Sequence, residues 1–430
     1  MRVLVMSLLL STVSAPLLAQ QPAGAAAAPT TAGAQPSLPT MPRSTTAPST
    51  STSTTATPTA SPPETPQAAT GEAAIQSADA AFTAFVQSLR PRAIAEGVTP
   101  ATFDRETAGL VFNPRVIRAD RGQPGAASTA TPGPLDFAPY RRAHVDQAHI
   151  VKGRSLYQSL STRLERMETN TGVPGKIALA IFGSETGYGS FSGNYDILRS
   201  FATLAFDGRR RDLFTAEFIA TLKLIDKGFT REELKGSWAG ATGFPQFLPS
   251  TYLRLAADGD GDGKADIWTS SADALASIAA YLREAGWKRG TPWGVAAMVP
   301  ATFDRASVTS PLVSPRCPRV HARLSRWLTV AEWKARGIIV AGFPAPADSE
   351  LVSLIEPDGP GLTAYLLTTN YRVILDYNCS NFYGLSIGLL ADEVARTPAP
   401  APMPAAALLP VTTPPASSPQ PGGAPAGAAS

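Results

Sequence analysis

The chain has 430 residues, with 37 Lys and Arg, 34 Asp and Glu, 2 Cys and a net charge of +3 at pH 7. A nearly balanced charge excludes a nucleic-acid binder that relies on a basic surface, and so few cysteines exclude a cysteine-stapled miniprotein. Nearly all charged residues lie within 74–396. Their spread excludes a membrane-embedded protein and leaves enough chain for two or three packed units.

The N-terminus has the pattern of a secretory signal peptide over residues 1–19. Arg2 precedes a short apolar run that begins at Val3 and continues to Ala19. The run is too short for a bilayer, which takes about 20 apolar residues, and Ala19 is the small residue that a signal peptidase requires. We expect cleavage after Ala19, a periplasmic location and no membrane anchor; an uncleaved anchor is the alternative.

Two segments lack the large apolar side chains that a packed core needs. Residues 20–73 are rich in Ala, Pro, Ser and Thr, and residues 397–430 contain no charged residue. Such segments cannot offset the backbone entropy of ordering, about 1–2 kcal/mol per residue. The composition predicts a disordered linker over 20–73 and a disordered tail over 397–430.

Helical periodicity dominates the first part of the folded chain. Residues 74–160 are expected to form an N-terminal helical subdomain, in which apolar residues recur at helical spacing from Phe82 to Leu89. A surface loop is expected over 122–139, and one long helix over 143–168. Residues 161–300 are expected to form a core whose helices cover 177–185, 214–225 and 274–285.

The period changes in the last third of the chain. Apolar runs at 351–355 and 362–367 flank a Pro- and Gly-rich turn and predict a β-hairpin, and a further strand is expected over 373–375. We therefore expect a small mixed β-containing subdomain over 301–375, and a helix over 376–396 that completes the core. The predicted fold class is α+β, mainly α.

Glu185 is the candidate general acid. It follows Ile177 and Ile181 at four-residue spacing, so it shares their apolar stripe, and Gly187 places it in the last turn of the helix. Desolvation and the negative end of the helix dipole both raise the pKa of a carboxyl group. The alternative is a structural Glu that is bound to an Arg within the core.

Several segments together resemble the lytic murein transglycosylase B family. They are Gly183-Ser-Glu-Thr-Gly-Tyr-Gly189, Ser192-Gly-Asn-Tyr-Asp196, Phe201-Ala-Thr-Leu-Ala205 and Trp238-Ala-Gly-Ala-Thr-Gly-Phe-Pro-Gln-Phe-Leu-Pro-Ser250. The resemblance implies a soluble periplasmic enzyme with a lysozyme-like helical core. Such an enzyme cleaves the MurNAc–GlcNAc β-1,4 bond of peptidoglycan and forms 1,6-anhydro-MurNAc ends.

The resemblance also implies the chemistry and the substrate contacts. Glu185 acts first as general acid and then as base, and a second carboxylate is not needed; we expect Asp196 and Asp207 to be a cap and a turn residue. A hydrolytic muramidase and a non-catalytic murein-binding scaffold are the alternatives. The partners are peptidoglycan glycan strands, no nucleic acid is expected, and the protein is expected to be a monomer. The implied substrate-binding residues are Arg209, Arg210, Ser237, Gln246, Tyr281, Tyr377, Asn378 and Tyr383.

Some of these residues have structural alternatives, which the sequence leaves open. Tyr281 lies on an amphipathic helix and is equally suited to the core. Asn378 is equally suited to cap the last helix, and in most proteins an arginine run such as Arg209–Arg211 is a solvated turn.

An Asp-rich loop, Asp258-Gly-Asp260-Gly-Asp262-Gly263-Lys264, matches the start of an EF-hand. Alternating carboxylates converge on a hard cation, Gly263 permits the sharp turn, and Lys264 contributes its backbone carbonyl. Thr269 stands where an EF-hand has its bidentate Glu, and the resemblance implies Asp273 as the last ligand. We expect a structural Ca²⁺ site, with no cofactor needed for the chemistry. A metal-free turn with Asp273 capping a helix is the alternative.

Cys317 and Cys379 are the only thiols of the chain. In an exported protein two cysteines are more often bonded than free, so we expect a disulfide between them. Buried free thiols are the alternative.

Overall fold

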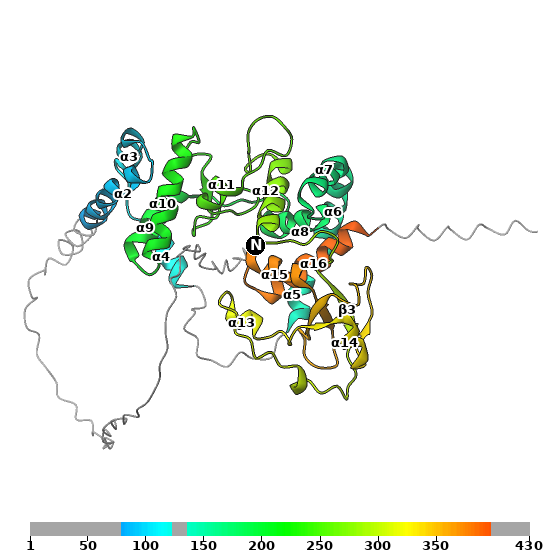
Figure 1. The fold of residues 1–430 in the computed structure, drawn as a ribbon. Coiled ribbons are helices and arrows are strands. Elements are labelled where there is room, and N and C mark those ends of the chain that lie inside the picture. Colours follow the sequence, from blue (N-terminus) through cyan, green and yellow to red (C-terminus); the bar gives the residue numbers. More distant parts are fainter. Residues whose placement is uncertain (1–78, 123–135, 397–430) are drawn as a thin grey trace, which may run out of the picture.

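The computed structural model describes residues 79–122 and 136–396, and helices make up most of it (Figure 1). The expected signal peptide, the linker over 20–73 and the tail over 397–430 lie outside these residues. None of the described helices is long and apolar enough to cross a membrane.

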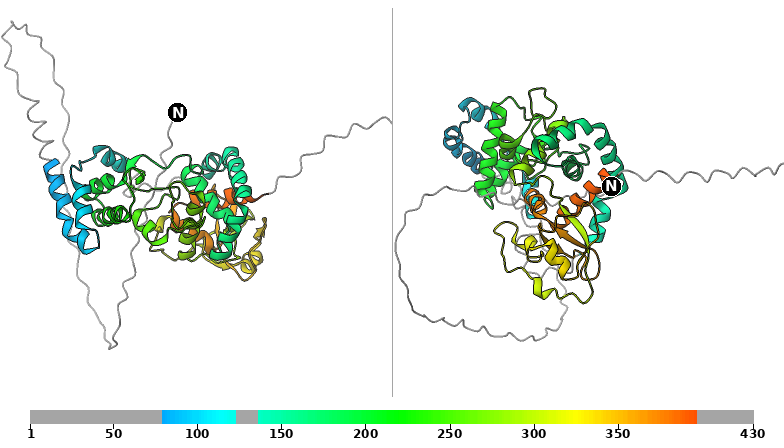
Figure 2. Two further views of the ribbon diagram at one scale, coloured as in Figure 1. Left: turned by 90° about the horizontal axis from the view of Figure 1, so that it is seen from above. Right: turned by 45° about the vertical axis from the view of Figure 1, so that its right-hand side comes forward.

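The N-terminal helices pack on a pair of longer helices. Helical residues 79–88 precede α2 (Arg90–Ala95), α3 (Pro100–Thr107) and α4 (Pro114–Arg121). Helix α3 packs against α10 (Arg211–Asp226), and α4 packs against α9 (Ile197–Asp207) (Figure 2). Phe82, Phe103 and Phe218 are completely buried in this cluster. The N-terminal helices therefore share one core with α9 and α10.

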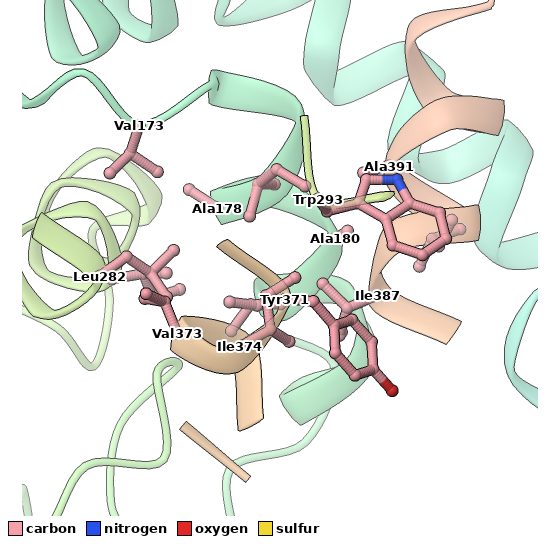
Figure 3. Packing of buried hydrophobic residues seen from close by; sticks show 14 of the residues in the cluster. Val173, Ala178, Ala180, Leu282, Trp293, Tyr371, Val373, Ile374, Ile387 and Ala391 are labelled. Atoms are coloured by element: carbon pink, nitrogen blue, oxygen red, sulfur yellow. The ribbon is translucent and has the colours of Figure 1, made fainter. Parts of the chain in front are cut away.

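Helix α8 (Gly175–Thr186) lies at the centre of a second core. It packs against α6 (Gln147–Ser159), α7 (Ser161–Thr171), α12 (Ser271–Glu284) and α16 (Asn381–Ala395). Figure 3 shows Val173 and Leu282 on one side of α8, with Trp293 and Ala391 on the other. Because neighbours cover α8 on several sides, its residues from Ile177 to Phe182 are all buried.

The single helix expected over 143–168 is wrong, because the chain breaks twice. The segment forms the end of α5 (Phe137–His144), then α6 and α7. Asp146 begins α6 by accepting the His149 N–H at 2.8 Å. Leu160 separates α6 from α7 with φ −103° and ψ 9°. Apolar side chains of all three helices face the same core, so the periodicity continues across the breaks.

An antiparallel sheet in the order β4-β6-β7-β3-β5 packs beside this core. Its strands are β3 (Gly294–Met298), β4 (Leu328–Thr329), β5 (Ile339–Val340), β6 (Leu351–Ile355) and β7 (Ala364–Leu367). The expected hairpin is confirmed, since Leu354 of β6 pairs with Leu366 of β7. Strand β3 was not expected, because its short run of Gly, Val and Ala has little β-propensity of its own.

The strand expected over 373–375 is wrong. These residues belong to α15 (Thr369–Tyr377), which Thr368 caps with its side chain. Tyr371, Ile374 and Leu375 are buried at helical spacing against the α8 core. An apolar run of three residues is compatible with a helix or a strand. Here the Thr368 cap and the packing against the α8 core favour the helix.

Short elements complete the described chain. Strand β1 (Tyr195–Asp196) pairs with β2 (Lys235–Gly236), and the other elements are α11 (Pro249–Leu255), a 3₁₀ turn (Ala306–Val308), α13 (Pro318–His321) and α14 (Val330–Ala335). A disulfide joins Cys317, just before α13, to Cys379, just before α16. The expected class, α+β and mainly α, is confirmed.

Candidate active site

Glu185 lies in the last turn of α8, where the sequence predicted it. The helix ends at Thr186, and Gly187 turns the chain with φ 58°. A Cβ on Gly183 would lie 2.4 Å from the ring of Tyr188. Glycine at 183 therefore lets the chain fold back on the helix and hold the Glu185 end of α8 in place.

The Glu185 carboxyl group has one partner and one free oxygen. The Tyr383 hydroxyl donates to Oε1 at 2.7 Å. The other oxygen, Oε2, is buried and has no hydrogen-bond partner among the described residues. Burial raises the pKa of Glu185 to about 7, although the hydrogen bond from Tyr383 acts in the opposite direction. Near neutral pH the group can therefore carry a proton on Oε2 and can also release it.

Three tyrosines surround this carboxyl group. Burial and the charge of Glu185 raise the pKa of Tyr140 to about 12, and they also raise the pKa values of Tyr377 and Tyr383 above the ordinary value. These tyrosines come from α5, α15 and α16. Sequence reasoning missed Tyr140, because nothing around it in the sequence signals a site and only the packing of α5 brings it here.

Asp196 and Asp207, the two residues considered from the sequence as a second catalytic carboxylate, have structural roles. Asp196 caps α9 by accepting the Arg199 N–H at 3.1 Å, and it also binds Arg231. Asp207 accepts a 2.7 Å hydrogen bond from Arg121. As expected, both are held at turns and helix ends. Within residues 79–122 and 136–396, burial and the Tyr383 hydroxyl alone set the pKa of Glu185.

The loop over 237–250 contacts Tyr377, and hydrogen bonds within the loop and to neighbouring residues hold its conformation. Gln246 has φ 53°, and its Nε2 donates to the carbonyls of Gly243 at 2.9 Å and Ser192 at 3.2 Å. The Tyr377 hydroxyl donates to the Pro245 carbonyl at 2.6 Å. Ser237 accepts a 3.1 Å bond from the Ala241 N–H. The loop therefore holds Gln246 in a backbone conformation that non-glycine residues rarely adopt.

A buried carboxylate that sequence reasoning missed anchors the same loop. Glu217 of α10 is 3% exposed. It accepts the Ser250 N–H at 3.0 Å and the Ser250 hydroxyl at 2.5 Å. In the sequence, the only sign of this role is that Glu217 is a charged residue on the apolar face of α10. Glu217 thus ties the end of the loop, where α11 begins, to the helical core.

Tyr281 and Asn378 are each placed beside Tyr377. The Tyr281 and Tyr377 ring centroids lie 4.8 Å apart, and the Tyr281 hydroxyl donates to the Asp376 carbonyl at 2.8 Å. The Asn378 Oδ1 is buried without a partner among the described residues. The last helix is capped by Ser380 rather than by Asn378, so the capping alternative for Asn378 is wrong.

The basic pair Arg209 and Arg210 binds a buried carboxylate that the sequence did not single out. Asp120 of α4 is 1% exposed and accepts from Arg210 Nη2 at 2.8 Å, while Arg209 Nε lies 3.2 Å from its other oxygen. The guanidinium of Arg210 also lies over the Phe214 ring. The pair is therefore a fixed feature of the α4–α9 junction rather than a solvated turn.

The Asp-rich loop brings together three of its expected ligands. Carboxylate oxygens of Asp258, Asp260 and Asp262 lie within 4.8 Å of one another and are exposed. Asp273 is not in this group; its buried carboxylate accepts the N–H groups of Gly259 and Asp266 at 2.8 and 2.7 Å. It therefore closes the loop through the backbone.

The chain matches the family model described as the transglycosylase SLT domain over residues 81–392. Membrane-bound lytic murein transglycosylase B of Escherichia coli (strain K12) is 28% identical over 259 residues, which are 60% of this chain and 66% of that relative. The chain thus matches slightly less than two thirds of the length of this curated relative.

Solved structures are similar in fold. SltB3 from Pseudomonas aeruginosa, solved with NAG-NAM-pentapeptide and with NAG-anhNAM-pentapeptide, is 36% identical, with a TM-score of 0.63, covering 73% of this chain and 79% of that chain. The Escherichia coli lytic transglycosylase Slt35, solved in complex with calcium, is 24% identical, with a TM-score of 0.58, covering 74% of this chain and 93% of that chain.

These similarities confirm the expected lysozyme-like fold class and, at the level of the family, the expected enzyme class. With the match extending from the N-terminal helices through α16, the chain belongs to the transglycosylase SLT domain family.

Proposed function

We propose that the chain is a peptidoglycan lytic transglycosylase that cleaves the MurNAc–GlcNAc β-1,4 bond, with Glu185 as its catalytic residue. The protonated carboxyl group donates its proton to the leaving glycosidic oxygen. The C6 hydroxyl of the MurNAc then attacks C1, and the Glu185 carboxylate takes the hydroxyl proton. The products are a 1,6-anhydro-MurNAc end and a free GlcNAc hydroxyl, and no water is consumed.

One observation carries this proposal: a single carboxyl group with a pKa of about 7 has one oxygen held by Tyr383 and the other free. A hydrolytic muramidase sets a second carboxylate about 5–9.5 Å from its acid. Ring closure by the substrate's own hydroxyl is intramolecular, so it needs no such group to activate water. The relative SltB3 was solved with a NAG-anhNAM ligand, which supports the anhydro product.

We propose that the saccharide groove is formed by the 237–250 loop and the segment 377–383. Contacts through the Tyr377 hydroxyl support this arrangement, since they join the two segments next to Glu185. Ser237, Gln246, Tyr281 and Asn378 offer polar atoms for the sugar hydroxyl and acetamido groups. Arg209 and Arg210, held by Asp120, are the proposed contacts for anionic groups of the substrate.

We propose that the Asp-rich loop binds a structural Ca²⁺. Three convergent carboxylates offer the hard oxygen ligands that Ca²⁺ prefers. Gly261 and Gly263 have φ values of 87° and 89°, which permit the tight loop. The Lys264 carbonyl is the proposed fourth ligand, and Asp273 holds the two ends of the loop together. A bound ion would stabilise the loop and would take no part in the chemistry.

The domain limits and the location also belong to this proposal. We assign the catalytic core to residues 161–300 with 376–396, and the sheet-bearing insertion to 301–375 together with β3. Export to the periplasm is supported by the sequence of residues 1–19, and we propose a monomer that acts on glycan strands.

Product analysis tests the reaction. Murein is digested with the purified protein, and mass spectrometry measures the reducing ends of the fragments. The proposal expects anhydro ends, which lack the water that a hydrolysed end gains. It also expects no product from Glu185→Gln, since an amide keeps the shape but cannot donate a carboxyl proton. Hydrolysed ends would instead assign a muramidase.

A further inference from the structure

The turn that follows Glu185 has a rare backbone conformation. Gly187, Tyr188 and Gly189 have φ values of 58°, 57° and 79°. All three therefore lie in the left-handed region, which glycine adopts readily and a tyrosine seldom does. Such a residue persists only where its surroundings hold it in place. The contacts that hold Tyr188 therefore also shape the end of the helix that carries Glu185.

The Tyr188 side chain is held between α8 and α6. It is 7% exposed, and its hydroxyl donates to the His149 carbonyl of α6 at 3.0 Å. Both helices have a glycine where the side chain lies against them. A Cβ on Gly153 of α6 would lie 2.4 Å from the Tyr188 hydroxyl oxygen, and one on Gly183 of α8 would lie 2.4 Å from its ring. Tyr188 therefore joins the last turn of α8 to α6.

Lys152 of α6 holds the same turn through a second set of contacts. Its ammonium group donates to the Gly187 carbonyl at 2.8 Å and to the Ser190 hydroxyl at 2.7 Å. A cation is favourable at the C-terminal end of a helix, where carbonyl groups lack partners within the helix. Lys152 is exposed, whereas Tyr188 is buried, so we expect Lys152 to contribute less than Tyr188.

The contacts from α6 reach Glu185 through the backbone. Tyr383 donates to the Glu185 Oε1 at 2.7 Å, and it is the one described residue that forms a hydrogen bond with this carboxyl group. The titratable groups that face the carboxyl group are the three tyrosines of α5, α15 and α16. Among the described residues, no charged group of α6 contributes to the pKa of Glu185. An effect of Tyr188 on Glu185 must therefore act through position.

We propose that Tyr188 is a positioning residue that keeps Glu185 within hydrogen-bond distance of Tyr383, with α6 as its support. This inference rests on the proposed function, in which Glu185 is the catalytic residue. Without the bond to the His149 carbonyl the turn is less constrained, so the carboxyl group spends less time against Tyr383. The proton donor is then misplaced, and a displacement of about 1 Å can cost roughly 100-fold in rate.

Tyr188→Phe tests the proposal, because it keeps the ring and lacks only the hydroxyl group that binds α6. The rate of glycan cleavage is measured with the full-length protein. We expect kcat to fall about tenfold and KM to stay within about a factor of two, because the variant misplaces the proton donor and leaves the groove unchanged. Tyr365→Phe is the matched control. Tyr365 is 5% exposed in the same core, and Glu185 is not among the groups that shift its pKa, so this variant should cleave like the wild type.

The pKa of Glu185 separates positioning from a loss of stability. It is measured by NMR on protein with ¹³C-labelled glutamate carboxyl groups, and Glu185→Gln identifies the signal. Tyr188→Phe should raise this pKa, because the hydrogen bond from Tyr383 that lowers it forms less often. The same change should add no further shift in protein that already carries Tyr383→Phe, since that bond is then absent.

A second pair of variants changes the exposed contact and leaves the core intact. Lys152→Met loses both hydrogen bonds of the ammonium group and should lower kcat by a smaller factor than Tyr188→Phe. Lys152→Arg keeps a charged donor and should restore most of this loss.

Two results would overturn the proposal. One is a Tyr188→Phe variant that melts at a lower temperature but keeps the wild-type kcat and the wild-type pKa of Glu185. The other is an additional rise of this pKa when Tyr188→Phe is combined with Tyr383→Phe. The form of the new sugar ends is a separate readout: hydrolysed ends from the wild type would refute the proposed reaction and leave the positioning role in place.

Discussion

The Tyr383 hydroxyl lies 2.7 Å from Oε1 of Glu185, although 198 positions separate the two residues in the chain. This hydrogen bond crosses from the start of α16 to the end of α8. It stabilises the ionised form of a carboxyl group whose burial favours the protonated form. The two opposing effects set a pKa of about 7, which suits a group that must donate and accept a proton in one reaction.

Removing the Tyr383 hydroxyl should raise the pKa of Glu185. Tyr383→Phe loses the hydrogen bond that lowers this pKa, while burial still raises it. The alkaline limb of the kcat/KM pH profile reports deprotonation of Glu185. This limb should therefore move to higher pH, and kcat should fall. Tyr157→Phe is the control, because burial and the charges of Glu168 and Glu165, rather than Glu185, raise the pKa of Tyr157. An unchanged alkaline limb in Tyr383→Phe would contradict this role.

The ionised Glu185 carboxylate should lower the free energy of unfolding at neutral and higher pH. Its pKa is about 7 when folded and near 4.5 when unfolded, so the folded state binds the proton more tightly. Stability conferred by the protonated form is then lost as pH rises from about 4.5 to about 7. Glu185→Gln should melt higher than the wild type at pH 8, with little difference at pH 4.

The melting difference is measured by scanning calorimetry at both pH values. A gain of 1 kcal/mol corresponds to about 2–4 °C in domains of 150–250 residues. Equal melting temperatures at pH 8 would mean that the carboxylate is solvated.

Calcium should raise the melting temperature through the Asp-rich loop. An ion that binds only the folded state stabilises it by about 2.7 kcal/mol at one hundred times its dissociation constant. The double variant Asp260→Ala with Asp262→Ala should lose this increment. Asp212→Asn changes an exposed acid outside the loop and should keep it. If a chelator leaves the wild-type melting temperature unchanged, the loop is a metal-free turn.

The disulfide should stabilise the region that carries Tyr377 and Tyr383. Cys317 and Cys379 close a loop with a sequence separation of 62. Chain entropy assigns such a crosslink a stabilisation on the order of 4 kcal/mol. Replacing both residues by Ser should lower the melting temperature and weaken activity, because the segment 377–383 is then held less firmly. Tryptic mapping without reduction should recover the two cysteines as one crosslinked pair, whereas alkylated free thiols would exclude the bond.

The parts of the site that sequence reasoning reached are those with local signals. Glu185 shows both its apolar stripe and the glycine that ends its helix, and the hairpin of β6 and β7 shows two apolar runs around a turn. Tyr140, Asp120 and Glu217 were missed, because their roles depend on partners that are distant in the sequence. Strand β3 is held by pairing with β7 on one side and with β5 on the other. The roles of such residues depend on tertiary contacts, which a single sequence does not reveal.

The source of the oxygen at the new sugar end tests the central claim most directly. Murein is digested with the wild-type protein in water enriched in ¹⁸O, and the new MurNAc ends are weighed by mass spectrometry. Attack by the substrate's own C6 hydroxyl predicts anhydro ends that contain no ¹⁸O, and the same reaction with Glu185→Gln predicts no new ends. Incorporation of one ¹⁸O at C1 of the new ends would show that water is the nucleophile and would contradict the account.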